Sequence, residues 1–157
     1  MANNIGNSHV NKIKFEKRRI TVILLTIIWG LFLLINTWTE SLEQVLDFES
    51  FQFKWVSTPD YKSFFYFYDF TLVHPDYVTI KLGHFIGFAI MDLLLFILLR
   101  NHKFAILVSI IFAFITEFFQ LFFGRDGRFY DLIIDTLGVL SVYLLVKSIK
   151  YLNSKVS

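Results

Sequence analysis

Residues 20–38 read ITVILLTIIWGLFLLINTW, and no charged side chain interrupts this run. At a rise of about 1.5 Å per residue, a helix of this length spans the roughly 30 Å hydrocarbon core of a bilayer. The next residues, Thr39 to Glu43, offer no small-x-small cleavage site of the kind that follows a secretory signal peptide. The run therefore predicts a retained transmembrane helix.

The composition of the whole chain favours a membrane environment. Of its 157 residues, 55% are hydrophobic and 20 are Phe. A water-soluble domain of this length has no way to bury so much apolar surface, so an ordinary soluble enzyme is excluded. The chain has no Cys, which excludes disulfides, thiolate metal ligands and cysteine nucleophiles. A net charge of only +2 does not indicate a nucleic-acid-binding protein.

Three further apolar runs, at 82–99, 104–123 and 131–146, predict three more spans. The last run is short, but the basic residues at its end can reach the membrane surface along their aliphatic stems. We therefore expect an all-α integral membrane protein with four transmembrane helices, forming one domain over residues 1–157.

The long connection between the first two spans, residues 39–80, is rich in Phe, Tyr and Trp. Aromatic residues in this number are typical of a membrane interface or of a segment packed over the mouth of a helix bundle. Pro-Asp pairs predict turns at 58–60 and 74–76. We expect a short amphipathic helix within residues 40–55.

The basic residues predict the orientation. Five of them lie between Lys12 and Arg19, Arg100 and Lys103 flank a tight turn, and three more occupy the C-terminal tail. Residues 39–80 carry two basic side chains against seven acidic ones. The positive-inside rule then places both termini in the cytoplasm, and the 39–80 segment and the turn at 124–130 outside.

Ionisable side chains within the spans point to a site. Each costs about 2.5–3.5 kcal/mol at the centre of a membrane helix on insertion scales, so each needs a partner or a function. Those near the outer end recur at spacings of three or four, which places them on one face of each helix. Antiparallel neighbours would bring them together in one polar pocket that is open to the outer surface: Lys81, His84, Glu117, Gln120, Arg125, Asp131 and Asp135.

Other polar and small residues have structural interpretations. The same carboxylates could simply pair with Lys81 and Arg125 to hold the helices together. Asp92 lies eleven residues beyond Lys81, about 16 Å deeper, on nearly the same face. It could extend the pocket or bond to Ser109, and we favour the structural interpretation. We expect the small residues Gly83, Gly87 and Gly138 to permit close approach between helices.

The motifs of this pocket resemble the VanZ-like family of small bacterial membrane proteins. They are Lys81-x-x-His84-Phe85, then Glu117-x-x-Gln120 with Arg125 after it, then Asp131-x-x-x-Asp135-x-x-Gly138. The resemblance covers residues 81–145 in order and spacing, whereas residues 1–80 contribute only an anchor helix and a long outer loop. One position departs from the family pattern, which commonly has Asn where this chain has Asp135.

The resemblance implies a multi-pass protein of the bacterial cell membrane, because the family consists of such proteins. It implies reduced susceptibility to lipoglycopeptide antibiotics, since the founding member is associated with low-level resistance to teicoplanin. A role in cell-envelope or lipid homeostasis is an equal implication, because many members occur without a resistance cluster. The partner would then be a membrane lipid, a lipid-linked molecule or the lipoglycopeptide itself.

Three functions remain open from the sequence. In the first, the chain binds a ligand, and Lys81, Arg125 and Arg128 hold its phosphate or carboxylate at the headgroup level. In the second, it is an enzyme acting on a lipid headgroup or a cell-wall precursor, with His84 and Glu117 as acid and base and Asp131 beside them. In the third, Glu117 and Asp92 relay protons in a transporter. We place binding first.

No cofactor and no metal are expected. One His with scattered carboxylates, such as His84, Glu117 and Asp131, is a weak metal-binding pattern.

Overall fold

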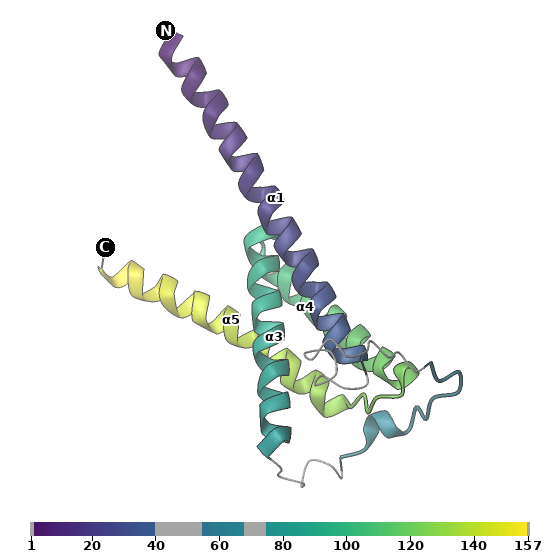
Figure 1. Cartoon of the computed structure of the whole chain (residues 1–157). Helices are drawn as coiled ribbons and strands as arrows, with labels where there is room; N and C mark the ends of the chain where they lie inside the picture. Colours follow the sequence, from purple (N-terminus) through teal and green to yellow (C-terminus); the bar gives the residue numbers. More distant parts are fainter. Residues whose placement is uncertain (1, 40–54, 68–74, 157) are drawn as a thin grey trace.

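The structure is a computed structural model that describes residues 2–39, 55–67 and 75–156. Every regular element within these ranges is helical (Figure 1). Four α-helices follow in the order α1 (Ala2–Trp38), α3 (Pro75–Leu99), α4 (His102–Gln120) and α5 (Phe129–Val156). Two short 3-10 helices are η1 (Ser63–Phe65) and η3 (Leu121–Phe123). The prediction of an all-α chain is confirmed.

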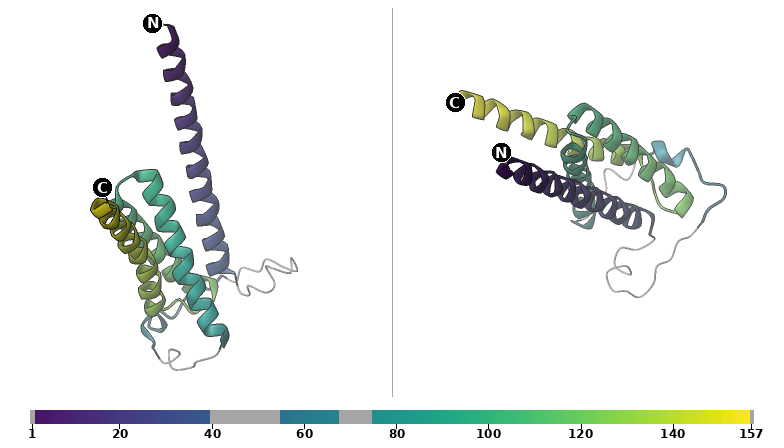
Figure 2. Two further views of the ribbon diagram at one scale, coloured as in Figure 1. Left: turned by 90° about the vertical axis from the view of Figure 1, so that its left-hand side faces the viewer. Right: turned by 90° about the horizontal axis from the view of Figure 1, so that it is seen from above.

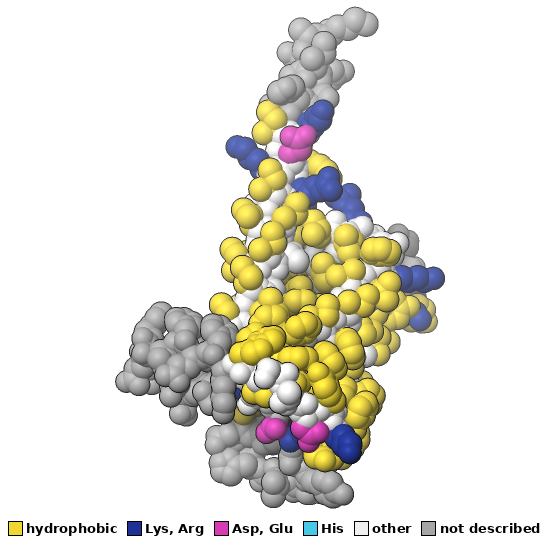
Figure 3. All heavy atoms as spheres, turned by 90° about the vertical axis from the view of Figure 1, so that its right-hand side faces the viewer, with side chains coloured by type: hydrophobic (Ala, Val, Ile, Leu, Met, Phe, Trp, Pro, Cys, Tyr) yellow, Lys and Arg dark blue, Asp and Glu magenta, His cyan; other side chains and the backbone are white. Residues whose placement is uncertain are grey.

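Each α-helix contains a stretch that is long and apolar enough to cross a membrane. These stretches are Lys12–Trp38, Val78–Leu99, His102–Phe123 and Phe129–Lys155, which confirms the four predicted spans. Their outward side chains are apolar: Ile28, Leu107 and Leu144 are each at least half exposed. Figure 3 shows hydrophobic side chains over much of one face, with Lys and Arg side chains along the N-terminal part of α1. Such a surface matches lipid rather than water.

The helices extend beyond the predicted apolar runs. α1 begins at Ala2 and projects past the other helices (Figure 1). Residues 2–19 contain no Pro that would break this helix. The expected turn at 74–76 lies partly outside the described residues, and Pro75 is the first residue of α3. Pro suits this place because the first turn of a helix needs no hydrogen bond from its N–H. α4 begins after Asn101, whose side chain accepts a hydrogen bond from the Phe104 N–H.

Helix α3 packs against α1, α4 and α5 and is crossed obliquely by α5 (Figure 1). The crossing is close at Gly138 of α5, where a Cβ atom would lie 2.2 Å from the carbonyl oxygen of Phe85. Only a residue without a side chain fits there, as expected. Gly87 also approaches a neighbour, since its Cβ would lie 2.8 Å from Leu33 of α1. Gly83 differs from the expectation, because nothing lies within 4 Å of a Cβ atom there.

The start of α1 and the end of α5 both lie toward the end of the bundle that contains the α3–α4 turn (Figure 2). We call this the inner end and the opposite one the outer end, after the orientation that the basic residues predict. Between them lies the apolar core, made of Leu33, Phe88, Met91, Leu95, Ala105, Ala113 and Val139.

The described part of the long outer connection, residues 55–67, packs against the outer ends of α4 and α5. The N–H of Val56 donates to the carbonyl of Phe122 at 2.8 Å. Phe64 of η1 is buried, and its ring contacts those of Phe118 and Phe129 at centroid distances of 6.3 and 6.1 Å. This stretch therefore covers part of the bundle, as its aromatic content predicted. The amphipathic helix expected within 40–55 falls almost wholly outside the described residues.

Candidate functional site

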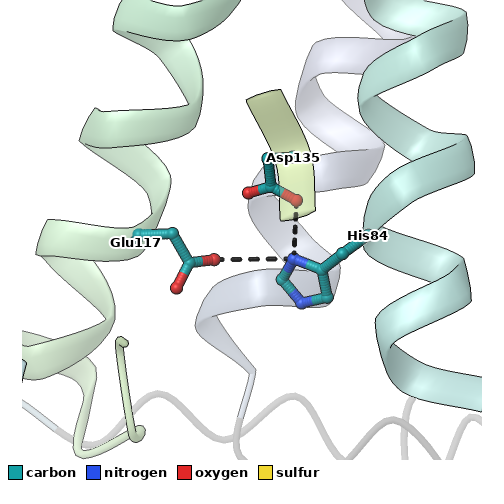
Figure 4. Close-up of side chains that lie close together, drawn as sticks. All are labelled: His84, Glu117 and Asp135. Carbon is teal, nitrogen blue, oxygen red and sulfur yellow. Dashed lines mark hydrogen bonds and ion pairs between the residues drawn. The ribbon is translucent and has the colours of Figure 1, made fainter. Parts of the chain in front are cut away.

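Three helices bring one ionisable side chain each to the same point near the outer end. His84 comes from α3, Glu117 from α4 and Asp135 from α5 (Figure 4). The imidazole Nδ1 of His84 lies 3.1 Å from Oδ1 of Asp135 and 3.5 Å from Oε1 of Glu117. Both carboxylates are fully buried, and the His84 side chain is 14% exposed. We call these three residues the outer cluster.

Glu117 is held in place by two donors besides His84. The side-chain amide of Gln120, one turn along α4, donates to Oε1 at 2.8 Å. The backbone N–H of Arg128 approaches Oε2 at 3.4 Å. This approach depends on Gly127, because a Cβ atom there would lie 2.1 Å from the Glu117 carbonyl oxygen. The loop between α4 and α5 therefore presses directly against α4 beside the carboxylate.

Lys81 and Asp131 form a separate ion pair on the outer side of the cluster. The Lys81 Nζ lies 2.6 Å from Oδ1 and 2.7 Å from Oδ2 of Asp131. The ammonium also lies 4.9 Å from the centre of the Tyr130 ring. The sequence grouped Asp131 with His84 and Glu117, but the carboxylate that contacts His84 is Asp135, one turn further along α5. Asp131 neutralises Lys81 instead.

The two arginines of the α4–α5 loop hold the outer segments. Arg125 donates from Nη1 to the carbonyl oxygen of Thr39 at 2.5 Å, which joins the loop to the end of α1. The guanidinium of Arg128 donates to the carbonyl of Ser63 at 2.7 Å and lies 3.3 Å from Asp126. Arg128 is buried, and its hydrogen bond to Ser63 supports the packing of η1 over the bundle.

A pocket of about 340 Å³ opens between α1 and α3 and reaches His84 and Arg125. Most of its lining is apolar, with Trp29, Phe32 and Leu33 on α1 facing Ile80 and Ile86 on α3. Polar groups lie at its outer part, among them Asn36, Thr37 and Thr79. The indole N–H of Trp29 donates to the Gly87 carbonyl at 2.9 Å, which fixes this side of the pocket. The sequence analysis treated α1 only as an anchor and missed this contribution.

A signal for the α1 side of the pocket does exist in the sequence. Trp29, Leu33 and Asn36 follow one another at spacings of four and three, which places them on one helix face. A Trp and an Asn on one face of an otherwise aliphatic span mark the side that contacts protein rather than lipid.

The outer cluster carries more negative groups than the described residues can pair. Two buried carboxylates share one imidazole nitrogen, and Oδ2 of Asp135 has no hydrogen-bond partner among the described residues. Burying an unpaired polar or charged group is costly, so the cluster has capacity for a further donor or cation. The other imidazole nitrogen, Nε2, makes no hydrogen bond within the described part of the chain, and it points away from both carboxylates in Figure 4.

The same three side chains form a donor set that a divalent metal accepts. One nitrogen of His84 and one oxygen each of Glu117 and Asp135 lie within 4.8 Å of one another. Imidazole and carboxylate ligands suit transition metals such as zinc. Of the two imidazole nitrogens, Nδ1 is the one that contacts both carboxylates. A metal ion held through Nδ1 would take the place of a hydrogen bond from Nδ1 to a carboxylate.

Asp92 belongs to a different group. Its Oδ1 accepts from the Ser109 hydroxyl at 3.2 Å, and Oδ2 lies 3.1 Å from Nε2 of His102. The His102 ring stacks on Phe96 and meets Tyr143 edge-on. We call Asp92, His102 and Ser109 the inner cluster. The structural interpretation of Asp92 fits this arrangement.

Comparisons with known proteins agree with the resemblance found in the motifs. The model of the VanZ/LLP1 family matches residues 20–150. An uncharacterized membrane protein of Bacillus subtilis (strain 168), YwnJ, is 34% identical over 123 residues, which cover 76% of this chain and 87% of that protein. No solved structure matches.

Proposed function

This chain belongs to the VanZ/LLP1 family, and from that premise we propose that it binds an amphiphilic, anionic molecule in the outer leaflet of the bacterial cell membrane. The ligand would be a membrane lipid, a lipid-linked cell-wall molecule or a lipoglycopeptide such as teicoplanin. By binding it, the protein would lower susceptibility to such antibiotics or support envelope homeostasis. Both termini would face the cytoplasm.

The observation that carries this proposal is the composition of the pocket between α1 and α3. Its aliphatic and aromatic lining suits an acyl chain, whereas Arg125 and His84 offer donors to a headgroup. Pockets that bind small molecules commonly combine an apolar lining with a few polar groups of this kind. The planar guanidinium of Arg125 suits phosphate or carboxylate oxygens, with which it can form two parallel hydrogen bonds.

The experiment measures teicoplanin susceptibility in a sensitive host that expresses the wild-type chain or one of two variants at Gly83. This residue lines the pocket, and nothing lies within 4 Å of a Cβ atom there. Gly83→Leu should therefore occupy the pocket without disturbing the helices, while Gly83→Ala adds one methyl group as a matched control. We expect protection from wild type and Gly83→Ala and its loss in Gly83→Leu, at equal membrane abundance.

A glycopeptide without an acyl chain provides the second control, because an apolar pocket has no reason to affect it. Protection that survives Gly83→Leu would contradict the pocket as the binding site. If no chain protects, direct binding of undecaprenyl phosphate to the purified protein distinguishes an envelope role from no binding at all. Wild-type binding that Gly83→Leu abolishes would support the envelope role, and absence of binding would overturn the proposal.

A second candidate function, a membrane-embedded hydrolase or transferase, is favoured by the orientation of His84. Its Nδ1 faces the carboxylates of Asp135 and Glu117, while Nε2 makes no hydrogen bond within the described residues. A carboxylate that accepts from Nδ1–H holds an imidazole so that the opposite nitrogen can take up a proton from water or a hydroxyl group. His84 also lines the pocket, so it lies beside the place proposed for the headgroup.

Catalysis is tested by incubating the purified chain with a lipid phosphate or a lipid-linked precursor and measuring product release. In this role His84→Gln abolishes turnover while binding persists, and Asp135→Asn slows it. A metal chelator separates the two uses of Nδ1, because turnover by an oriented imidazole survives chelation and turnover at a metal centre does not. Equal turnover by wild type and His84→Gln would exclude this role.

A further inference from the structure

A second pocket, of about 320 Å³, lies at the inner end between α1 and the C-terminal end of α3. It is separate from the outer cluster, and the proposed function makes no use of it. Its apolar part is formed by Val22 of α1 and by Ile97, Leu98 and Leu99 of α3. Its polar part consists of Arg18, Arg19 and Arg100.

The three guanidinium groups have no acidic partner within the described ranges. No carboxylate there lies within ion-pair distance of Arg18, Arg19 or Arg100. Glu16, on the same part of α1, does not line the pocket. The C-terminal end of α3 contributes only about half a negative charge. Three full positive charges outweigh it, so the pocket is strongly attractive to anions.

The position of Arg100 is set by its backbone and by a ring. Its φ angle is 55°, in the left-handed region, and its N–H closes the end of α3 by donating to the Phe96 carbonyl. The guanidinium then lies 5.0 Å from the centre of the Phe15 ring on α1, within the range of a cation–π contact. Arg100 therefore reaches across from α3 to the helix that supplies Arg18 and Arg19.

We propose that this inner pocket binds a phosphate group at the cytoplasmic surface of the membrane, through Arg18, Arg19 and Arg100. Guanidinium groups match phosphate oxygens in geometry as well as charge. The apolar residues of the pocket lie within the candidate spans Lys12–Trp38 and Val78–Leu99, which fits the acyl end of an anionic phospholipid. Basic pockets between transmembrane helices on this side of a membrane are suited to such headgroups. Free inorganic phosphate is the other source of the same chemistry.

The test is native mass spectrometry of the full chain in detergent, with phosphatidylglycerol, phosphatidylcholine or millimolar inorganic phosphate added. Arg100→Gln should weaken binding of the first phosphatidylglycerol molecule by about tenfold, because it removes charge-assisted hydrogen bonds to the phosphate. Arg18→Gln/Arg19→Gln should weaken this binding further. Lys103→Gln and Lys12→Gln/Lys14→Gln remove the same charges outside the pocket. Their affinity for the first phosphatidylglycerol molecule should stay within about twofold of wild type, because no direct contact with the phosphate is lost and salt screens more distant charges. Thermal unfolding of each variant without lipid checks the fold.

The three added ligands distinguish a lipid headgroup from free phosphate as the group that is bound. Tight binding of phosphatidylglycerol that inorganic phosphate does not displace identifies the lipid, and displacement identifies free phosphate at the same residues. Equal losses of phosphatidylglycerol affinity in the Arg and Lys variants would mean that only the overall positive charge matters, and would overturn the proposal. Wild-type affinity that is equal for phosphatidylglycerol and phosphatidylcholine, with no phosphate bound, would also overturn it.

Discussion

The outer and inner clusters contain the same contact, a His nitrogen 3.1 Å from an Asp oxygen, yet their surroundings differ. In the inner cluster both oxygens of Asp92 have partners, and aromatic rings enclose the His102 ring. In the outer cluster two carboxylates share one imidazole, one oxygen of Asp135 has no partner among the described residues, and His84 borders a pocket. A candidate site therefore differs from a structural ion pair in two ways: it has a carboxylate oxygen without a partner, and it borders a pocket.

A layer of apolar side chains separates the two clusters. Phe88, Ala113 and Val139 are all fully buried, and each lies four residues from a member of the outer cluster on its own helix. Four residues later on α3 and earlier on α4 come Asp92 and Ser109 of the inner cluster. Each step is about 6 Å along a helix. The layer contains no side chain that could pass a proton between Glu117 and Asp92, which weighs against the transporter hypothesis.

The largest expected effect comes from Gly138→Ala, which would disrupt the packing of α5 against α3 and with it the apolar layer between the two clusters. The new methyl group would lie 2.2 Å from the Phe85 carbonyl oxygen, so α5 has to move away from α3. Overpacking of this kind costs about 1–3 kcal/mol and occasionally more. We expect a clear drop in thermal stability in detergent, together with loss of ligand binding in the pocket between α1 and α3. Gly83→Ala is the matched control, and equal stability of the two variants would contradict the close crossing.

The next effect separates function from stability at the outer cluster. Glu117→Gln keeps the shape of the side chain and removes one of two neighbouring negative charges. Gln has one acceptor oxygen where Glu117 has two, so either the Gln120 amide or the Arg128 N–H loses its partner and the loop that carries Arg125 is held less firmly. We therefore expect ligand binding about tenfold weaker, equivalent to about 1.4 kcal/mol. Relief of the repulsion between two buried carboxylates should leave the unfolding temperature unchanged or raised. Isothermal titration and thermal unfolding of one preparation measure both. A variant that loses stability and retains binding would assign Glu117 to the structural role of Asp92.

The opposite pattern is expected at the inner cluster. In Asp92→Asn the side chain keeps one acceptor but loses its charge beside His102. The cost should be about 1 kcal/mol, the usual scale for polar contacts between membrane helices. Ligand binding in the pocket beside His84 should not change, because the apolar layer that contains Phe88 separates the inner cluster from the outer cluster. A binding defect in this correctly folded variant would couple the two clusters and revive a role for Asp92 beyond packing.

The sequence predicted which residues gather at the outer end but not which of them touch. Spacings of three and four place Lys81 with His84 and Glu117 with Gln120 on single helix faces, and antiparallel spans bring those faces to one depth. Asp131 and Asp135 share a face, so the choice between them depends on where α5 crosses α3. The crossing is set by the fit of Gly138 against the Phe85 backbone, which no helical periodicity encodes.

Two other features escaped the sequence for different reasons. The α1 side of the pocket lies in a run that is mainly apolar on every face, so average hydropathy does not show which side contacts protein; the spacing of Trp29 and Asn36 was the signal that went unused. The partner of Asp92 was missed because His102 was assigned to a turn. In the structure α4 begins at His102, which turns this residue toward α3.

The smallest effect is expected from Asp135→Asn, which converts this chain to the residue that the VanZ-like pattern commonly has. Asn keeps an acceptor for Nδ1 of His84 and replaces the unpartnered oxygen Oδ2 by a donor. Stability should rise by less than about 1 kcal/mol, and ligand affinity should stay within about twofold of wild type. The measurement is the same titration as for Glu117→Gln. A tenfold loss in Asp135→Asn would mean that the ligand needs the Asp135 charge, which fits a cation or a metal ion and contradicts the anionic ligand proposed above; it would also set this chain apart from relatives with Asn.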